Sequence, residues 1–374
     1  MTSQSAKKPA GKTQAAVKKS VSARKTKTRT KIQIAAGAAA ETSLDAILAA
    51  MRVRVPKAGF AEAQAFVGEF YRRMAEDEFP QHTPEVWAAL ALDLLDFARR
   101  RKPGTASVRM FNPATKAHGW ESAHTVLQIV NDDMPFLVDS VSMKLAELGI
   151  GVHVLGHPVV RFGRDRNGRV TTVGEGKPES LMVLEVDRQP AEAMDGIVAA
   201  IAEVLAQVRL AVQDWAAMRE KMLALADDLA TRKLPVDDSG RSEAQEFLRW
   251  VANDHFALFG YREYRVGKRG GQDVLLPQAG TGLGLMRDAA IDASTDPLPP
   301  CETGDALILT KTNARSPIHR SGYMDYIGVL EYDAKGRPVA EQRFLGMFTS
   351  SAYTRRPWEI PMVRERHEYV MRMS

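Results

Sequence analysis

Apolar side chains in the first part of the chain recur at helical spacing. One set lies three, four and seven positions apart and predicts a helix with a single core-facing side: Phe60, Phe66, Val67, Phe70, Tyr71 and Met74. Thr83 and Pro84 predict the start of a second helix, because a threonine oxygen can cap a first turn that also tolerates proline. The basic run at 99–102 follows at the end of this helix, where positive charge suits the helix dipole. The run therefore does not by itself indicate nucleic-acid binding.

From residue 105 the apolar pattern becomes that of β-strands. Helices are predicted after a turn at 131–135 and over 191–206, and strands are predicted at 107–112, 124–130, 152–162, 169–173, 181–186 and 208–212. The order strand, helix, strand, strand, helix, strand is that of a split βαβ fold, an antiparallel sheet with both helices on one face. This region is predicted to form a ferredoxin-like βαββαβ domain.

The rest of the chain predicts a second domain of mixed structure. A helical segment at 214–232 and a turn-rich stretch at 234–240 precede a helix at 243–251. Strands then dominate, at 256–266, 273–276, 306–311, 326–332 and 338–349, and this order predicts a mainly antiparallel α+β domain. A helical pattern at 357–371 runs towards Ser374 with no closing element, so we expect this domain to be truncated on its C-terminal side.

The chain as a whole is predicted to be α+β, with four parts. These are a basic tail at 1–40, N-terminal helices with the ferredoxin-like domain at 41–215, a helical linker at 216–240 and the second domain at 241–374. Hydrophobic residues at 45% and charged residues at 26% are typical of globular proteins that fold in water. No apolar run approaches the roughly 18 to 20 residues that cross a bilayer, so no membrane association is predicted.

The charge is unevenly distributed. Residues 1–40 contain ten lysines or arginines and no acid, so the remainder is mildly acidic although the formal net charge is +5. A tail without aromatic residues has little to bury and is predicted to be disordered. We expect it to bind nucleic acid only non-specifically, through charge.

Few motifs indicate chemistry. Gly280, Gly282 and Gly284 are the candidate for a dinucleotide-binding turn, but no phosphate-binding helix within a βαβ unit follows them, so a loop is predicted. His153 and His157 are four apart, yet the intervening glycine and a following proline argue against a helix that would aim both at one metal.

Two further features were weighed as sites. Cys301 is the single cysteine; it excludes an internal disulfide, fits a reducing cytosol and is predicted to be structural. A basic loop is predicted to be solvated, with anion binding as the alternative: Lys311, Arg315, His319 and Arg320. We therefore predict no catalytic, cofactor-binding or metal-binding residue in this chain.

The turn at 131–136 is the most specific element. Its named residues are Asn131, Asp132, Asp133, Pro135 and Phe136. Acids before a helix ordinarily cap it, and helix N-terminal amides can also receive a carboxylate. The turn resembles that of ACT-type amino-acid-sensing modules, which place an Asp, a Pro and then a Gly there, whereas this chain has Phe136 at the glycine position. We predict a helix cap and domain contact, with an amino-acid effector as the alternative.

The resemblance extends beyond this turn. Residues 130–150, 243–264, 280–288, 307–329 and 343–353 resemble, in order, the N-terminal region of the large bacterial NAD-specific glutamate dehydrogenases. That family resemblance implies ACT-like and PAS-like regulatory domains here. It also implies a catalytic domain further along a longer polypeptide, which converts glutamate and NAD⁺ to 2-oxoglutarate, ammonium and NADH. No counterpart of that catalytic domain is found in this sequence, so no catalytic residue is carried over, and NAD is expected as a cofactor of the full-length family only.

The leading hypothesis is therefore a regulatory and oligomerisation portion of such a dehydrogenase. Its expected partners are the catalytic portion of the polypeptide, further copies of itself and a small amino-acid effector, all in the cytoplasm. Two alternatives stay open: a free-standing ACT-like sensor of an amino acid, and a nucleic-acid-associated protein acting through its basic tail.

Overall fold

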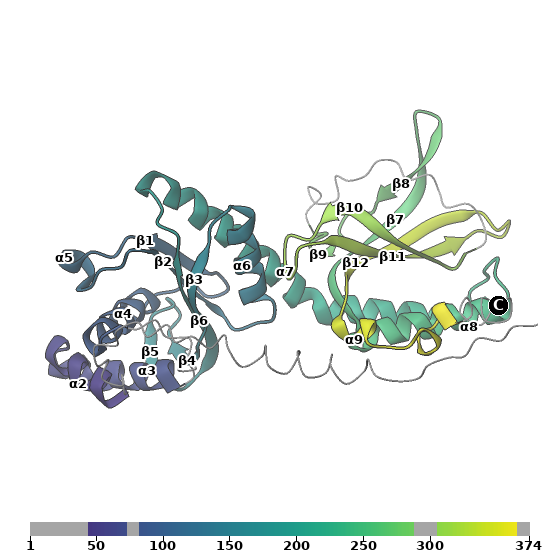
Figure 1. The fold of residues 1–374 in the computed structure, drawn as a ribbon. Helices are drawn as coiled ribbons and strands as arrows, with labels where there is room; N and C mark the ends of the chain where they lie inside the picture. Colours follow the sequence, from purple (N-terminus) through teal and green to yellow (C-terminus); the bar gives the residue numbers. More distant parts are fainter. Residues whose placement is uncertain (1–43, 73–81, 288–304, 365–374) are drawn as a thin grey trace, which may run out of the picture. The chain divides into compact units, whose positions relative to one another are not determined.

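A computed structural model describes residues 44–72, 82–287 and 305–364 (Figure 1). The predictions for the basic tail, for Met74, for Cys301 and for the end of the helical pattern at 357–371 lie outside the described residues. Two antiparallel sheets and the helices around them confirm the α+β prediction. In this part of the chain no helix is long and apolar enough to cross a membrane.

Three helices form the N-terminal segment: α2 (Leu44–Arg54), α3 (Phe60–Arg72) and α4 (Pro84–Ala98), with a short 3-10 turn at Lys57–Gly59 before α3. Their apolar stripes meet one face of the first sheet in a shared core, in which the rings of Phe66 and Phe162 stack 6.1 Å apart. The predicted start of α4 is confirmed, but Thr83 makes no side-chain hydrogen bond to the helix backbone. The predicted cap is therefore wrong.

The first sheet has six strands in the order β1-β2-β6-β4-β5, with β3 also paired to β6. The bounds are β1 Ser107–Phe111, β2 Thr125–Asp132, β3 Val152–Gly156, β4 Val159–Arg164, β5 Val170–Val173 and β6 Lys177–Val186. A one-turn helix, α5 (Thr115–His118), lies between β1 and β2. The helices α6 (Leu137–Glu147) and α7 (Ala191–Asp228) cover the face opposite α2 to α4 (Figure 1). Because both faces are covered, eight consecutive residues of β6 are buried.

The predicted closing strand at 208–212 is wrong. These residues lie inside α7, a single helix of 38 residues. Val208 and Ala211 continue a buried stripe that begins with Ile201 and Val204, so helical spacing decides the structure of a run that strand propensity also allows. The place beside β2 that the fourth strand of a βαββαβ sheet would take is held by β1, which precedes β2 in the chain. The helix also runs through the predicted boundary at 215–216, and the division into domains stays a prediction.

The second sheet follows α8 (Asp238–Trp250) and a π-helical turn at Val251–His255. Its order is β10-β11-β12-β7-β8, with β9 also paired to β7. The strands are β7 Phe256–Arg269, β8 Gln272–Pro277, β9 Leu283–Gly284, β10 Leu307–Arg315, β11 Tyr323–Tyr332 and β12 Pro338–Phe348. A short helix, α9 (Ser350–Tyr353), and a 3-10 turn at Pro357–Glu359 come last. The predicted strands and the hairpin turn between β11 and β12 are confirmed.

Candidate functional site

The turn between β2 and α6, residues 131–136, is the candidate site. Helix α6 begins at Leu137, its N-cap residue is Phe136, and no side chain caps it. Asp133 is exposed, and its backbone N–H donates to the carbonyl of Pro178 at 3.2 Å. The prediction that Asp133 caps α6 is therefore wrong. The helix begins later, and its N-cap is Phe136, three residues after Asp133.

Phe136 adopts the left-handed backbone conformation, with a φ of 72°. Residues with a Cβ adopt this region at a cost of roughly 1–2 kcal/mol, whereas glycine adopts it freely. The position at which ACT-type turns carry glycine thus keeps the glycine-like backbone here, although a phenylalanine occupies it. The contacts of its ring hold it there.

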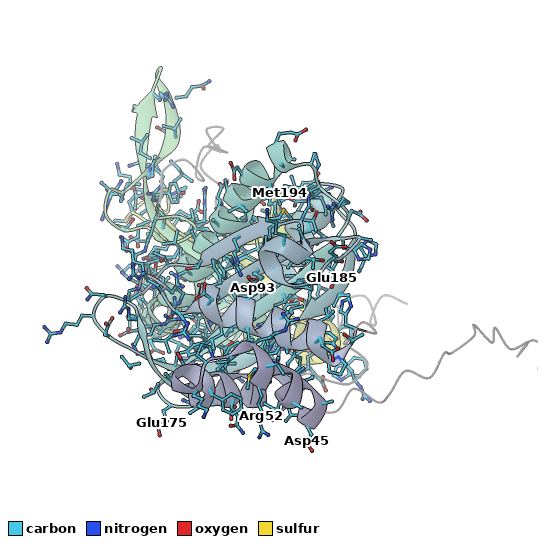
Figure 2. The ribbon with its side chains drawn as sticks, turned by 90° about the vertical axis from the view of Figure 1, so that its left-hand side faces the viewer. Asp45, Arg52, Asp93, Glu175, Glu185 and Met194 are labelled. Carbon is cyan, nitrogen blue, oxygen red and sulfur yellow. The ribbon has the colours of Figure 1, made fainter. Side chains whose placement is uncertain are left out.

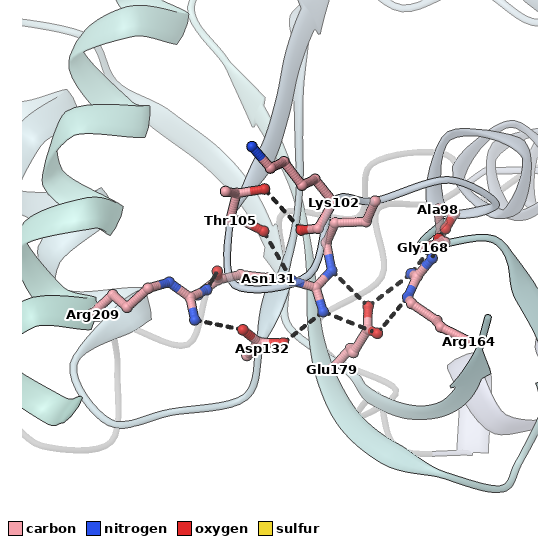
Figure 3. A network of polar contacts seen from close by, with 10 residues as sticks. Ala98, Lys102, Thr105, Asn131, Asp132, Arg164, Gly168, Glu179 and Arg209 are labelled. Atoms are coloured by element: carbon pink, nitrogen blue, oxygen red, sulfur yellow. Dashed lines mark hydrogen bonds and ion pairs between the residues drawn. The ribbon is translucent and has the colours of Figure 1, made fainter. Parts of the chain in front are cut away.

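The other end of the turn lies in a cluster of buried and half-buried charges, which we call the arginine cluster (Figure 3). Its members are Arg101, Asp132, Arg164, Glu179 and Arg209. Asp132 accepts from Arg101 at 2.6 Å through one oxygen and from Arg209 of α7 at 2.5 Å through the other. The second guanidinium nitrogen of Arg209 donates to the side-chain oxygen of the buried Asn131 at 2.5 Å. The turn is thereby tied to α7.

Glu179 of β6 extends the arginine cluster to the hairpin of β4 and β5. It is 1% exposed and accepts from Arg164 at 2.6 Å and from Arg101 at 3.1 Å. Arg164 also donates to the carbonyl of Ala98 at the end of α4. Three guanidinium groups thus face two carboxylates, and each carboxylate oxygen has a donor, which is the condition for burying charge without a large penalty.

The charges of the arginine cluster fix the ionisation of Asp132. Partial burial raises the pKa of Asp132, but hydrogen bonds and charge from Arg101 and Arg209 outweigh it and hold the pKa below its ordinary value. Asp132 is therefore held in its ionised form, and its ion pairs link the turn to Arg101 and to Arg209 of α7. It is not a proton-transfer group.

The apolar end of the turn contacts the loop between β10 and β11. The ring of Phe136 lies 4.8 Å from that of His319 and 5.9 Å from that of Phe259 in β7. Ser140 of α6 accepts a 2.8 Å hydrogen bond from the backbone N–H of His319. Burial lowers the pKa of His319, and nearby Arg320 adds to this against the opposing effect of Asp139. One turn therefore touches the core of the first sheet and a loop of the second.

The glycine-rich segment at 280–284 also contacts α7. Asp214 of α7 accepts from the backbone N–H of Gly284 at 2.7 Å and from Arg287 at 2.5 and 2.6 Å. A Cβ on Gly284 would lie 2.1 Å from the carbonyl oxygen of Phe259. These glycines permit close packing of chain on chain. The predicted loop is found only at 280–282, because Leu283 and Gly284 form β9 and pair with β7.

The other sequence candidates do not converge. His157 bonds Ser180 at 2.5 Å, whereas His153 pairs with Asp187 at 2.7 Å and stacks on His124. Glu185, labelled in Figure 2, accepts from His82 and His124, each at 3.1 Å. Within the described ranges no group of three or more metal-ligating side chains could hold an ion.

The predicted basic loop is also dispersed. Lys311 pairs with Asp325 at 2.6 Å, and Arg315 lies over the ring of Tyr323. Arg320 donates to the carbonyl of Phe348. His319 alone faces the turn at 131–136, so these side chains do not form one anion site.

Sequence reasoning missed four residues that hold this site, Arg101, Arg164, Glu179 and Arg209, and it missed Asp214, which holds the glycine-rich segment. A signal was present for Asp214, which occupies a buried position of α7 between Ala211 and Met218. A charged residue at a core-facing position requires a partner. For Arg209 the signal was hidden, because the predicted strand at 208–212 placed it in the wrong element.

Comparisons with known proteins show what the chain is similar to. A family model described as "Glutamate dehydrogenase, ACT1 domain" matches residues 66–201. The chain is 33% identical to the NAD-specific glutamate dehydrogenase of Halomonas elongata over 86% of its length, and 32% identical to that of Pseudomonas aeruginosa over 83%. The enzyme of the same name from Mycobacterium tuberculosis is 26% identical over 74% of the chain.

The chain spans about one fifth of the length of these relatives, 21% and 20% for the first two. The matched family model covers α4, the whole first sheet, α6 and the first part of α7, and so includes the turn at 131–136. The chain belongs to the family of NAD-specific glutamate dehydrogenases and corresponds to its N-terminal, ACT1-containing region.

Proposed function

We propose that this chain is the regulatory and oligomerisation portion of an NAD-dependent glutamate dehydrogenase. In that proposal the catalytic portion of a longer polypeptide converts glutamate and NAD⁺ to 2-oxoglutarate, ammonium and NADH. The ACT-like part and a PAS-like second domain bias its activity, in response to a small amino-acid effector. Copies of the chain associate, and the protein works in the cytoplasm.

The observation that carries the proposal is the double attachment of the turn at 131–136. Asn131 and Asp132 are bonded to Arg209 of α7, and Phe136 packs against His319 of the second sheet. A ligand or neighbouring subunit that displaces the turn would have to change both attachments together. A change at one sheet then alters contacts at the other, which is what coupling between two sites requires.

The first experiment tests for chemistry in the chain itself. The purified chain is titrated with NAD⁺ by calorimetry and assayed for glutamate-dependent NADH production. We expect neither binding nor turnover. Micromolar NAD⁺ affinity, or NADH formation above a blank, would contradict the assignment of a regulatory portion.

The second experiment tests for an effector. Melting temperatures of the wild type, Phe136→Ala and Asp133→Asn are measured with a panel of amino acids, and sedimentation gives the oligomeric state. Asp133 is the matched control, because it is exposed in the same turn and has no side-chain partner among the described residues. We expect one amino acid to raise the melting temperatures of the wild type and of Asp133→Asn by the same amount. It should change the melting temperature of Phe136→Ala by a different amount.

The alternatives predict other outcomes. A free-standing sensor would bind its amino acid with no change in association, and no longer polypeptide would be read from the gene. A nucleic-acid-associated protein would bind DNA or RNA through the tail, with an affinity that falls steeply as salt rises.

A further inference from the structure

Two arginines of the first sheet face each other without a carboxylate between them. Arg100, just after α4, and Arg169, just before β5, form an isolated antiparallel bridge. The flanking hydrogen bonds run from Val170 N–H to the carbonyl of Arg99 at 2.9 Å and from Arg101 N–H to the carbonyl of Gly168 at 3.0 Å. Both arginines are exposed.

This hydrogen-bond pattern fixes the geometry of the pair. The two bonds lie on either side of Arg100 and Arg169, so the pair itself is of the non-hydrogen-bonded kind. In such pairs the Cα atoms are about 4.5 Å apart and the side chains leave the same face close together. Like charges placed directly opposite each other in this way are destabilising.

The neighbouring arginines have partners, but these two do not. Arg99 pairs with Glu62 at 2.9 Å, and Arg101 pairs with Asp132 and Glu179 in the arginine cluster. Among the described residues neither Arg100 nor Arg169 has an ion pair or a side-chain hydrogen bond. The nearest acid of the hairpin, Asp165, uses its oxygen Oδ1 to accept the backbone N–H groups of Asn167 and Arg169.

We propose that Arg100 and Arg169 form a binding site for a small oxyanion with two negative charges, a phosphate group or a dicarboxylate. Guanidinium groups bind such oxygens through paired, charge-assisted hydrogen bonds. A dianion would satisfy both guanidinium groups and remove their mutual repulsion, whereas a single chloride or carboxylate would neutralise only one charge. This site is separate from the turn at 131–136 and does not depend on its function.

The test measures the melting temperature of the full chain with inorganic phosphate or succinate, at an ionic strength held constant with potassium chloride. We expect a saturable rise of about 3 °C when the anion reaches ten times its Kd. A rise with phosphate alone identifies a phosphate site, and a rise with succinate alone identifies a dicarboxylate site. No rise with either anion overturns the proposal.

Three variants locate the effect. The double variant Arg100→Gln with Arg169→Gln should lose the anion response, while Arg166→Gln should keep it. Arg166 is the matched control, because it is an exposed arginine of the same hairpin and also lacks a partner among the described residues. An equal response in the double variant would overturn the proposal.

Arg169→Glu separates the site from a general effect of charge. It creates an oppositely charged cross-strand pair with Arg100, so the melting temperature without added anion should rise. The anion response should vanish in the same protein. A lower melting temperature without anion, or a response that persists, would show that the two arginines do not act as a pair.

Discussion

Carboxylates in both sheets lie among arginines, and they differ in burial and in the number of cations around them. In the arginine cluster three guanidinium groups face Asp132 and Glu179. In the second sheet Glu341 of β12 is 1% exposed, has Arg343 as its cation and accepts a hydrogen bond from Tyr326. Arg343 lies between the rings of Tyr264 and Tyr326, at 4.2 and 4.8 Å. We call this second group the tyrosine cluster.

The pKa values of Asp132 and Glu341 move in opposite directions. The pKa of Asp132 is lowered, since two arginines outweigh its burial. Burial raises the pKa of Glu341, and Arg343 opposes this without reversing it. Asp132 is half-buried and has two arginines, whereas Glu341 is 1% exposed and has one, so burial and the number of nearby cations together decide the charge of a carboxylate.

The largest effect is expected from removing a cation of the arginine cluster. Arg101→Met leaves Asp132 and Glu179 short of a partner in a site where Arg101 itself is 3% exposed. Breaking one side of a buried ion pair costs about 3–5 kcal/mol of unfolding free energy. Urea denaturation measures it, and Arg166→Met, at an exposed arginine without a partner among the described residues, should stay within about 0.5 kcal/mol. Equal losses in the two variants would refute the cluster's role.

A smaller effect is expected from Phe136, at the apolar end of the turn at 131–136. Phe136→Ala loses a half-buried ring and should cost about 2 kcal/mol, below the range for fully buried rings. Phe136→Gly loses the same ring but suits the left-handed backbone, so it should be about 1 kcal/mol more stable than the alanine variant. Thermal melts of both variants give the order. A glycine variant less stable than the alanine variant would exclude strain at this position.

The pH dependence of stability tests the comparison directly. The pKa of Asp132 is lowered, so its contribution is present above its unfolded pKa of about 4 and is lost as pH falls below it. The pKa of Glu341 is raised, so its contribution is full below about pH 4.3 and is lost as pH rises through its folded pKa. Melting temperatures are therefore measured between pH 2.5 and 7. Their dependence on pH should be weaker than in the wild type at the acid end in Asp132→Asn, and above about pH 4.3 in Glu341→Gln. If melting temperature depended on pH in the same way in both variants, the opposite pKa shifts of Asp132 and Glu341 would be contradicted.

The smallest effect is expected outside both clusters. Deleting residues 1–40 should change the unfolding free energy by less than about 0.5 kcal/mol, the range of neutral surface changes. It should abolish salt-sensitive binding to nucleic acid. Differential scanning calorimetry and a binding titration at two salt concentrations measure these outcomes. A large loss of stability would mean that the tail contributes to the folded core.

The sequence predicted most strands, because short apolar runs bounded by turn residues mark strands even where both faces of a sheet are covered. It failed at 208–212, where Val208, Leu210 and Val212 fit a strand and a buried helix equally well. It also failed at Asp133, since no local rule placed Phe136 at the N-cap. The arginine cluster could not be predicted at all. Arg101 and Glu179 are 78 residues apart in sequence, and Asp132 lies opposite Glu179 only through the register of β2 and β6.

The length of α7 has a consequence for how its sequence can change. Arg209 bonds the turn at 131–136, and Asp214 bonds the glycine-rich segment. The two residues are five apart, which places them about 140° apart around the helix axis. Deleting one residue between them would rotate everything downstream by about 100° and draw it back by about 1.5 Å. Arg209 and Asp214 could then no longer reach their partners at the same time. The number of residues between them in α7 therefore fixes the relative orientation of the turn at 131–136 and the glycine-rich segment.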